Sequence, residues 1–199
     1  MQVSYNIDNE KPSESCGIVG IYSLDQDISQ LIYFGIYSLQ HRGQESAGIA
    51  CSDGQKISLH KDLGLVNQVF KEENLNKLKG NIAIGHTRYS TMGSNRTYNS
   101  QPIRADGPKG SIYLGHNGNV INALDLKNHL SEWGVKNYDS TSDSEIIAQL
   151  YAMCPGLNWH QKSEYCMSKL KGAYSLVMLS EDTLVGVRDP LGIRPLCLG

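Results

Sequence analysis

Apolar residues along this chain recur at spacings that change from strand-like to helical and back again. Residues 16–21 form a short run of β-branched residues with two glycines, which predicts a buried strand. Apolar positions at helical spacing follow, and Gly43 is well placed to end that helix. These positions are Ile28, Leu31, Ile32, Gly35 and Leu39.

The next part of the chain predicts mainly strands. Residues 47–51 and 56–60 have strand character, and Asp53-Gly54 between them is a strong hairpin signal. A short helical piece over 72–78 precedes a third apolar strand at 82–85. These segments indicate antiparallel neighbours with short connections.

A long polar stretch interrupts this pattern. Residues 90–102 are rich in Ser, Thr, Asn and Gly and offer almost nothing to bury. A loop of this length inside a compact domain is usually functional or disordered. Strand character resumes at 111–114 and ends in the segment 115–119.

Helices are predicted in the second half, followed by strands. Asn122 can cap one helix, a Ser-x-x-Glu capping box at 142–145 precedes a second, over 146–153, and a third covers 159–170. The strands that follow, separated by short polar turns, are 173–179, 184–187 and one beginning at 195–198.

The order of these elements predicts an α+β fold. Strands joined by short hairpins favour antiparallel sheets over the alternating strands and helices of a Rossmann-like domain. The sequence also has no G-x-G-x-x-G pattern and no P-loop, so it gives no sign of a nucleotide cradle.

Composition narrows the possible functions. The formal net charge is −2 and no basic block occurs, so nucleic-acid binding has no electrostatic support. The longest apolar runs are too short to span a membrane. The five cysteines are scattered without C-x-x-C spacing, so no metal-ligand set is visible. With no signal peptide, we expect a reducing cytoplasm.

Fifteen polar residues of mixed charge precede Cys16. This leader is either a disordered tail or a segment whose removal makes Cys16 the first residue. A first-residue cysteine carries a nucleophilic sulfur together with an α-amine of pKa about 7.7–8.0, which can act as the local base. The alternative interpretation is that Cys16 is a small apolar strand residue, the usual fate of a free cysteine.

Two histidines and an arginine stand at predicted strand ends. His86 and His116 suggest metal, but no further ligand has convincing spacing, and imidazoles satisfied by local hydrogen bonds are the better interpretation. Arg88 is either a solvated charge or a group that grips a substrate carboxylate in a bidentate manner beside the polar loop.

Two further positions have both a structural and a chemical interpretation. Asp143 either stabilises a helix N-terminus or pairs with a ligand ammonium. Asn117-Gly118 is either a tight turn or an oxyanion hole built from the Asn117 amide and the Gly118 N–H. A nucleophile, oxyanion donors, a cation and an anion together describe a site for a zwitterionic α-amino acid with a side-chain carbonyl.

The sequence resembles a known family in seven motifs that occur in the family's order. They are Cys16-Gly17-Ile18-Val19-Gly20, Leu39-Gln40-His41-Arg42-Gly43-Gln44-Glu45-Ser46-Ala47-Gly48, Gly85-His86-Thr87-Arg88-Tyr89-Ser90-Thr91, His116-Asn117-Gly118-Asn119, Ser142-Asp143-Ser144-Glu145, Gly172-Ala173-Tyr174 and Arg188-Asp189-Pro190-Leu191-Gly192-Ile193-Arg194-Pro195-Leu196. They resemble the class II glutamine amidotransferases. Within that class they are most similar to the glutamine phosphoribosylpyrophosphate amidotransferase family.

The resemblance implies an N-terminal-nucleophile fold, with two antiparallel sheets sandwiched between helical layers. By motif position it implies that Cys16 is the nucleophile and that Asn117 and Gly118 form the oxyanion hole. It makes Arg88 the clamp for the α-carboxylate and Asp143 the partner of the α-ammonium group.

Four more residues are implied to contact or border the substrate. Thr91 and Tyr89 fall in the family's glutamine lid, and Arg42 and Gly43 lie near the nucleophile in relatives. The resemblance further implies that residues 1–15 are a propeptide and that 16–199 are the glutaminase domain, truncated at its C-terminal end.

The same resemblance implies partners and cofactors outside this chain. L-Glutamine would be hydrolysed here, and its ammonia would convert phosphoribosyl pyrophosphate into phosphoribosylamine, the first step of purine synthesis. The phosphoribosyltransferase domain, its Mg²⁺ and a [4Fe–4S] cluster would belong to the absent part, leaving no metal or cofactor in this chain. The full-length protein is expected to be a cytoplasmic homo-oligomer.

Three alternatives stay open at this point. One is another class II amidotransferase, similar to glucosamine-6-phosphate synthase, although those enzymes typically have tyrosines where this chain has His41 and Gln44. Another is an N-terminal-nucleophile hydrolase that acts on a different amide, with autoproteolysis as its main event. The last is a catalytically silent regulatory module that keeps its leader.

Overall fold

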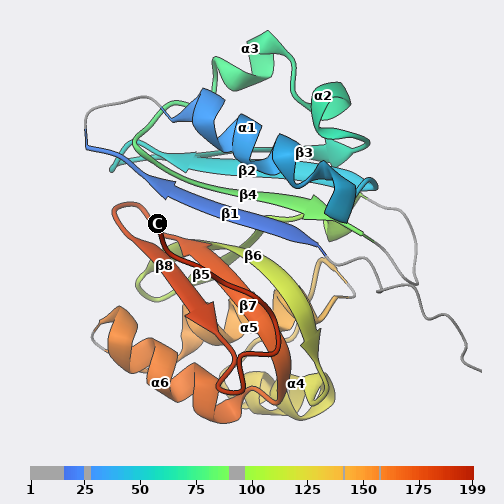
Figure 1. The fold of residues 1–199 in the computed structure, drawn as a ribbon. Coiled ribbons are helices and arrows are strands. Elements are labelled where there is room, and N and C mark those ends of the chain that lie inside the picture. The colour runs from blue at the N-terminus through green and yellow to red at the C-terminus, as the bar shows by residue number, and fades with distance from the viewer. Residues whose placement is uncertain (1–15, 25–27, 90–96, 141, 157) are drawn as a thin grey trace, which may run out of the picture.

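Two four-stranded antiparallel sheets pack face to face, and helices cover the outer side of each sheet (Figure 1). The computed structural model describes residues 16–24, 28–89, 97–140, 142–156 and 158–199. The expected sandwich of helix, sheet, sheet and helix layers is therefore confirmed. No helix in the described part of the chain is long and apolar enough to cross a membrane.

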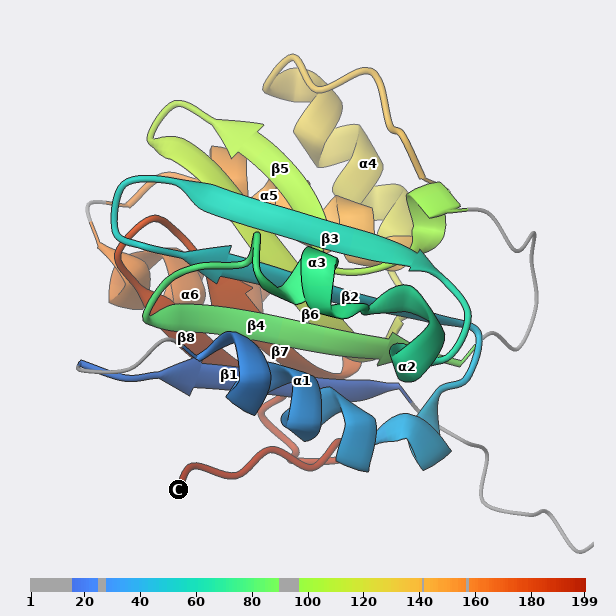
Figure 2. The same cartoon turned by 90° about the horizontal axis from the view of Figure 1, so that it is seen from above.

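The first sheet is built from the N-terminal half of the chain. Its strands, in spatial order, are β1 (Gly17–Tyr22), β4 (Ile82–Arg88), β2 (Ser46–Ser52) and β3 (Ile57–Leu63). Three helices lie over its outer face, and Figure 2 shows them from above. They are α1 (Ser29–Ser38), α2 (Val66–Val69) and α3 (Glu72–Leu75), and a 3₁₀ turn, η1 (Gln40–Arg42), follows α1.

The second sheet is built from the C-terminal half. Its strands, in spatial order, are β5 (Ile103–Gly107), β6 (Gly110–Val120), β7 (Gly172–Leu179) and β8 (Leu184–Arg188). The 3₁₀ turn η2 (Thr97–Asn99) precedes β5. The helices on its outer face are α4 (Ala123–Glu132), α5 (Asp143–Met153) and α6 (Trp159–Lys169).

Three apolar cores hold these layers together. One lies between the two sheets, where Ile84 of the first sheet and Val177 and Leu179 of the second belong to one buried cluster. The outer cores lie under the helices. Because Ile28, Ile32 and Ile36 recur every four residues, they place one face of α1 on the first sheet.

The helix α5 is the most deeply buried of the helices described. Eight of its eleven residues are buried, because it packs on β5 and β6 and has α4 and α6 as neighbours. A helix covered on most sides is apolar over most of its surface, and Ile146, Ile147 and Leu150 fit that pattern. Its N-terminal end is therefore held rigidly at the edge of the second sheet.

Most predicted elements are confirmed, with local differences of two kinds, the first at element ends. The capping box at 142–145 is wrong: Ser142 makes no side-chain cap, and Glu145 accepts the Asp139 and Ser140 N–H groups instead. Residues 195–198 form no strand. The helix predicted over 72–78 is a single turn, α3, and Asn122 bonds to the Lys169–Lys171 backbone rather than capping α4.

The remaining differences concern β5 and β6. The edge strand β5 went unpredicted because its exposed positions carry Arg104 and Asp106, which form an ion pair 3.0 Å long. The strand β6 continues to Val120, so Asn117-Gly118 lies inside a strand and not in a turn. Pairing with β7 overrides the turn preference of the Asn-Gly dipeptide.

A close contact between the layers gives a stability prediction. A Cβ added to Gly48 of β2 would overlap the backbone of Gln101. We expect Gly48→Ala to lower the free energy of unfolding by about 1–3 kcal/mol, as overpacking usually does. Denaturant unfolding measures the change.

The matched control is Gly186→Ala in β8. A Cβ at Gly186 would meet only Leu196, at an ordinary 3.6 Å. We expect this variant to stay within about 0.5 kcal/mol of the parent. Equal stability of the two variants would contradict the close contact at Gly48.

Candidate active site

Cys16 lies at the start of β1, at the open end of the sandwich. The pairing of Gly17 with Thr87 places Cys16 beside Arg88, the last residue of β4. The Cys16 Sγ donates to the Tyr89 carbonyl oxygen at 3.9 Å. The Arg42 Nε donates to the Cys16 carbonyl oxygen at 3.3 Å, so the predicted neighbour contacts this residue directly.

Gly43 allows a close approach beside this cysteine. A Cβ at Gly43 would lie 2.6 Å from the Arg88 carbonyl carbon and 2.7 Å from the Thr87 carbonyl group. Only a residue without a side chain lets the 42–43 turn pack on the end of β4. Arg42 and Gly43 therefore contact the backbone of both Cys16 and Arg88 and hold the two segments close to each other.

The Cys16 thiol has a shifted pKa. Burial raises it above its usual range, and the Asp143 carboxylate acts in the same direction. The Tyr89 carbonyl contact and the Arg88 guanidinium oppose this shift. The thiol therefore stays protonated at neutral pH and needs a base to become a nucleophile.

The charges that act on Cys16 come from both layers. Arg88 ends β4 in the first sheet, and the β1–β4 pairing places it beside Cys16. Asp143 begins a helix that covers the second sheet and bonds to the end of β6. A zwitterionic ligand between this cation and this anion stays a prediction.

Arg88 has a partner that the sequence did not reveal. Its Nη1 lies 3.4 Å from the Glu45 Oε1, and the two side chains are only 14% and 12% exposed. The backbone joins them as well, because the Glu45 N–H donates to the Arg88 carbonyl oxygen at 3.0 Å. This pair fixes the guanidinium at the mouth of the site and leaves part of its fork free for a second anion.

Asn117 and Gly118 lie within β6, opposite Ser175 and Tyr174 of β7. Asn117 is buried, and Gly118 has φ of +153°, a conformation that favours glycine. A side chain at Gly118 would also run into the Ala173 carbonyl. Gly118 therefore keeps the end of β6 and β7 close together.

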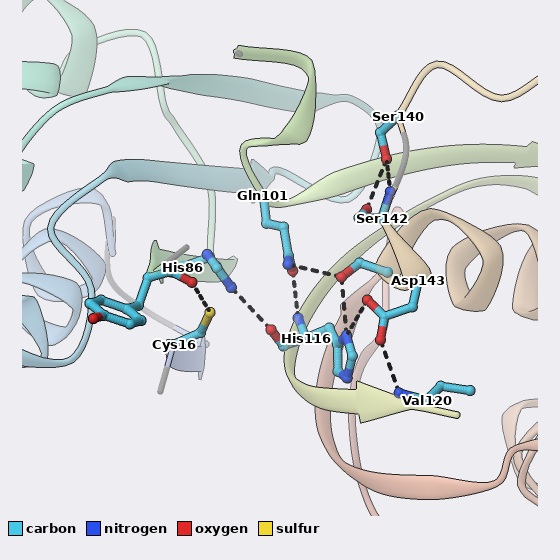
Figure 3. Close-up of polar contacts among 10 residues, drawn as sticks. Cys16, His86, Gln101, His116, Val120, Ser140, Ser142 and Asp143 are labelled. Atoms are coloured by element: carbon cyan, nitrogen blue, oxygen red, sulfur yellow. Dashed lines mark hydrogen bonds and ion pairs between the residues drawn. The ribbon is translucent and has the colours of Figure 1, made fainter. Parts of the chain in front are cut away.

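Asp143 begins α5 and reaches the end of β6 (Figure 3). Its Oδ2 accepts a hydrogen bond from the Val120 N–H at 2.9 Å, and its Oδ1 lies 3.8 Å from the His116 Nδ1. The carboxylate thus lies at the end of the strand that carries Asn117. Its side chain is 23% exposed, so it stays accessible to a ligand.

A buried polar network connects the two sheets behind these residues. The His86 Nε2 donates to the His116 carbonyl oxygen at 3.1 Å, which crosses from β4 to β6. The His116 N–H donates to the Gln101 Oε1 at 2.6 Å. Gln101 precedes β5. Its side chain bonds to the His116 N–H at a position where the β5 backbone no longer pairs with β6. Figure 3 shows these contacts from His86 through His116 to Asp143, with Cys16 nearby in a separate contact.

The network also fixes the tautomer of His86, which carries its proton on the Nε2 that meets the His116 carbonyl oxygen. The Gln101 Nε2 donates to the Ser144 Oγ at 3.0 Å, and that hydroxyl is also hydrogen-bonded to the His116 Nδ1, at 3.0 Å. Gln101 and Ser144 were not predicted; polar residues in a loop and a helix gave no signal.

Burial keeps both histidines neutral. It lowers the pKa of His86 to about 3, against the opposing hydrogen bond to the His116 carbonyl. It also lowers the pKa of His116, although the nearby Asp143 carboxylate acts the other way. Each imidazole has one ring nitrogen in a long-range hydrogen bond, not a local one, and its other ring nitrogen is buried without a partner among the described residues. Within the described ranges, no group of three or more His, Cys, Asp or Glu residues could hold a metal ion.

Lys61 fixes the segment that carries Gln101. Its Nζ donates to the Ser100 carbonyl oxygen at 2.6 Å and to the Pro102 carbonyl oxygen at 3.1 Å. Burial lowers the pKa of Lys61 to about 8, and the Glu145 carboxylate opposes the shift. This lysine of β3 thereby holds the loop end against the first sheet.

The structure places Arg42, Arg88 and Tyr89 beside Cys16, with Gly43 packed on Arg88, and it places Asn117, Gly118 and Asp143 together at the end of β6. Tyr89 contributes its carbonyl oxygen to the Cys16 contact, and its side chain is partly exposed. Thr91 lies outside the described residues, as do all residues of 90–96 in the polar stretch 90–102. The residues that sequence reasoning missed are Glu45, Gln101, Ser144 and Lys61.

Comparison with known proteins identifies one domain family. Residues 86–199 match the family model described as a glutamine amidotransferase domain. The chain is 46% identical over 192 residues to an amidophosphoribosyltransferase of Synechocystis sp., with 96% of this chain and 39% of the relative covered. It is 47% identical over 189 residues to the amidophosphoribosyltransferase of Methanothermobacter thermautotrophicus, with 92% of this chain and 39% of the relative covered.

Solved structures resemble this fold closely. A glutamine phosphoribosylpyrophosphate amidotransferase from B. subtilis, complexed with ADP and GMP, matches with a TM-score of 0.81 and 39% identity. A structure described as the allosteric regulatory enzyme of purine biosynthesis matches with a TM-score of 0.83 and 40% identity. Each match covers 90% of this chain and 38% of the other. The chain thus spans well under half the length of these relatives.

The buried histidines give a prediction about acid stability. His86 is neutral when folded, with a pKa of about 3, whereas an unfolded histidine binds a proton below about 6.5. The unfolded state therefore binds more protons, and the free energy of unfolding falls as pH drops below about 6.5. We expect His86→Gln to reduce this slope by about 1.4 kcal/mol per pH unit.

Denaturant unfolding between about pH 5 and 6 measures this slope, to which His86 and His116 both contribute, and His86→Gln removes the His86 share. His160→Gln is the matched control, because that side chain is 82% exposed. The control should leave the slope unchanged. Parallel pH dependences for His86→Gln and the parent would refute the neutral buried state.

Proposed function

The chain belongs to the glutamine amidotransferase domain family, and we propose that it is the glutamine-hydrolysing part of an amidophosphoribosyltransferase. The observation that carries the proposal is the placement of Cys16 beside Arg88 by the β1–β4 pairing, with Asp143 bonded to the end of β6, the strand that carries Asn117. Glutamine has an α-carboxylate, an α-ammonium group and a side-chain amide. These three groups match the cation, the anion and the nucleophile.

In this proposal Arg88 and Asp143 hold the amino-acid end of glutamine. The guanidinium keeps one edge against Glu45, 3.4 Å away, and offers further N–H groups to the α-carboxylate. The Asp143 carboxylate accepts from the Val120 N–H with one oxygen and binds the α-ammonium group with the other. The amide carbon then lies over the Cys16 sulfur. The two reacting atoms are thereby held close together, in the arrangement from which attack is fastest.

The nucleophile is Cys16 after removal of residues 1–15. While the leader is attached, the Cys16 nitrogen is a peptide amide and cannot accept a proton. Burial raises the pKa of its thiol, so the reaction needs a base nearby. A free α-amine on the same residue, with a pKa of about 7.7–8.0, supplies that base near neutral pH.

The reaction then follows the usual course of nucleophilic amide hydrolysis. The Cys16 thiolate attacks the amide carbon, and the Asn117 side-chain amide and the Gly118 N–H stabilise the oxyanion. The α-amine returns the proton to the leaving nitrogen, ammonia departs, and a thioester remains. Water then releases glutamate from the thioester and restores the thiol.

The residues around Cys16 keep this geometry in place. Arg42 holds the Cys16 carbonyl oxygen, 3.3 Å away, and Gly43 lets the turn pack on β4. Tyr89 and Thr91 are proposed to close over bound glutamine, which would exclude water from the thioester until ammonia has left. The His86–His116 bond joins β4, which ends at Arg88, to β6, which carries Asn117.

The activity of the whole protein is proposed from its relatives. They carry the name amidophosphoribosyltransferase, and ammonia from this domain would react there with phosphoribosyl pyrophosphate. We propose that this step, with Mg²⁺ and a [4Fe–4S] cluster, belongs to a part of the full-length protein outside this chain. A cytoplasmic homo-oligomer is proposed on the same basis.

Release of the leader should switch on glutaminase activity. We expect protein that begins at Cys16 to release glutamate from glutamine, and the chain with residues 1–15 attached to be essentially inactive, because it lacks the free α-amine. Cys16→Ala should abolish activity, whereas Cys197→Ala should retain it, since Cys197 is exposed. Glutamate release with intact mass checks both. Activity of the Cys16→Ala protein near the parent rate would rule out the nucleophile.

Loss of the oxyanion donor and loss of the carboxylate clamp should change different kinetic constants. Asn117→Ala should lower kcat by about 10²–10³-fold with KM little changed, because the donor acts on the developing charge. Arg88→Lys should mainly raise KM, because an ammonium cannot reproduce a bidentate grip. Steady-state glutaminase kinetics measure both. The reverse pattern would mean that the two roles are exchanged.

A further inference from the structure

Two cysteines without a role in the glutaminase reaction meet at the far end of α5. Cys154 follows the last residue of α5, whose first residue is Asp143, and Cys166 lies in α6. The structure holds both side chains in the core between the second sheet and its helices, 5% and 0% exposed. A hydrogen bond with the Cys166 thiol is the main influence on the pKa of Cys154.

A lysine belongs to the same cluster. The Cys154 Sγ donates to the Tyr151 carbonyl oxygen at 3.4 Å, and the Lys162 Nζ donates to that same oxygen at 3.2 Å. One acceptor therefore brings the ammonium group next to the Cys154 sulfur. Lys162 and Cys166 are four residues apart on α6, so they share the face that meets α5.

Cys154 also has a route to solvent. It lines a surface cavity of about 310 Å³, together with Lys109, Pro155, Gly156 and Gln161. The Lys109 side chain donates to the Gly156 carbonyl oxygen at the rim of this cavity. Cys166 is fully buried behind Cys154. A small reagent therefore reaches Cys154 first and Cys166 only through it.

Charge makes Cys154 the more reactive of the two thiols. The Cys166 hydrogen bond, then the Lys162 and Lys109 ammonium groups, lower the pKa of Cys154. Burial raises the pKa of Cys166 above its usual range, and the contact with Cys154 adds to that shift. A thiol with a lowered pKa and some exposure is the kind that oxidants attack.

We propose that Cys154 and Cys166 form a dithiol site that a small hydroperoxide oxidises to a disulfide joining α5 to α6. Cys154 is the attacking thiol and Cys166 is the resolving thiol. The site lies at the opposite end of α5 from Asp143, and it is separate from the glutaminase chemistry.

The chemistry balances in two steps. The Cys154 sulfur attacks one oxygen of hydrogen peroxide, the O–O bond breaks, and the departing hydroxide takes the Cys154 proton and leaves as water. The Cys166 sulfur then attacks the resulting sulfenic sulfur, and the S–O bond breaks. That hydroxide takes the Cys166 proton and leaves as a second water. One peroxide is reduced, and two thiols lose two hydrogen atoms.

The test uses the chain with Cys16→Ala and Cys197→Ser, which removes the partly exposed and the exposed thiol. Cys51, Cys154 and Cys166 then remain. Cys51 is the internal control, because it is fully buried in β2. After treatment with hydrogen peroxide, we expect the intact mass to fall by two hydrogen atoms. Peptide mapping should find a Cys154–Cys166 disulfide, with Cys51 still open to alkylation after unfolding.

A second variant separates the two roles. With Cys166→Ala added, Cys154 has no resolving thiol, so dimedone should trap its sulfenic acid. With Cys154→Ala added instead, Cys166 should stay unmodified. A treated parent in which Cys154 and Cys166 both remain alkylatable would overturn the proposal. So would loss of Cys51 at the same rate, which would mean that unfolding and not the site governs oxidation.

Discussion

The buried hydrogen bond from His86 to the His116 carbonyl oxygen sets the distance on which the site depends. It crosses the space between the two sheets, 3.1 Å long, in a region otherwise filled by apolar side chains. One end lies two residues before Arg88, and the other lies next to Asn117. In such a dry layer an unpaired carbonyl or imidazole costs more than the bond itself contributes. The two sheets therefore have one favourable separation at this point.

Around this bond, the charges of the site are arranged to hold an amino acid and to restrain the thiol. Burial and Asp143 keep Cys16 protonated, while Arg88 acts the other way. A ligand carboxylate on Arg88 and a ligand ammonium on Asp143 would neutralise both charges together. With both charges neutralised, the protonation of the Cys16 thiol would depend on the α-amine of Cys16. That free amine exists only once residues 1–15 have been removed.

The central chemistry could be proposed from the sequence, because it depends on rare residues with narrow requirements. Gly118 needs positive φ and close strand packing, Cys16 begins a strand after a polar leader, and Arg88 and Asp143 stand at element ends. Glu45, Gln101 and Ser144 could not be found this way. Each is an ordinary polar residue whose importance comes from a partner more than 30 positions away. The strand β5 was hidden for a related reason, since an edge strand with Arg104 and Asp106 has too little apolar pattern to be recognised.

The account makes one central claim: glutamine is held between Arg88 and Asp143 while Cys16 attacks its amide. A crystal structure of the processed protein, reacted with an electrophilic glutamine analogue, tests this most directly. The account predicts a covalent bond to the Cys16 sulfur, with the α-carboxylate of the analogue on the Arg88 guanidinium and its α-ammonium group on the Asp143 carboxylate. An analogue bonded to another cysteine, or bonded to Cys16 with both groups in solvent, would contradict it.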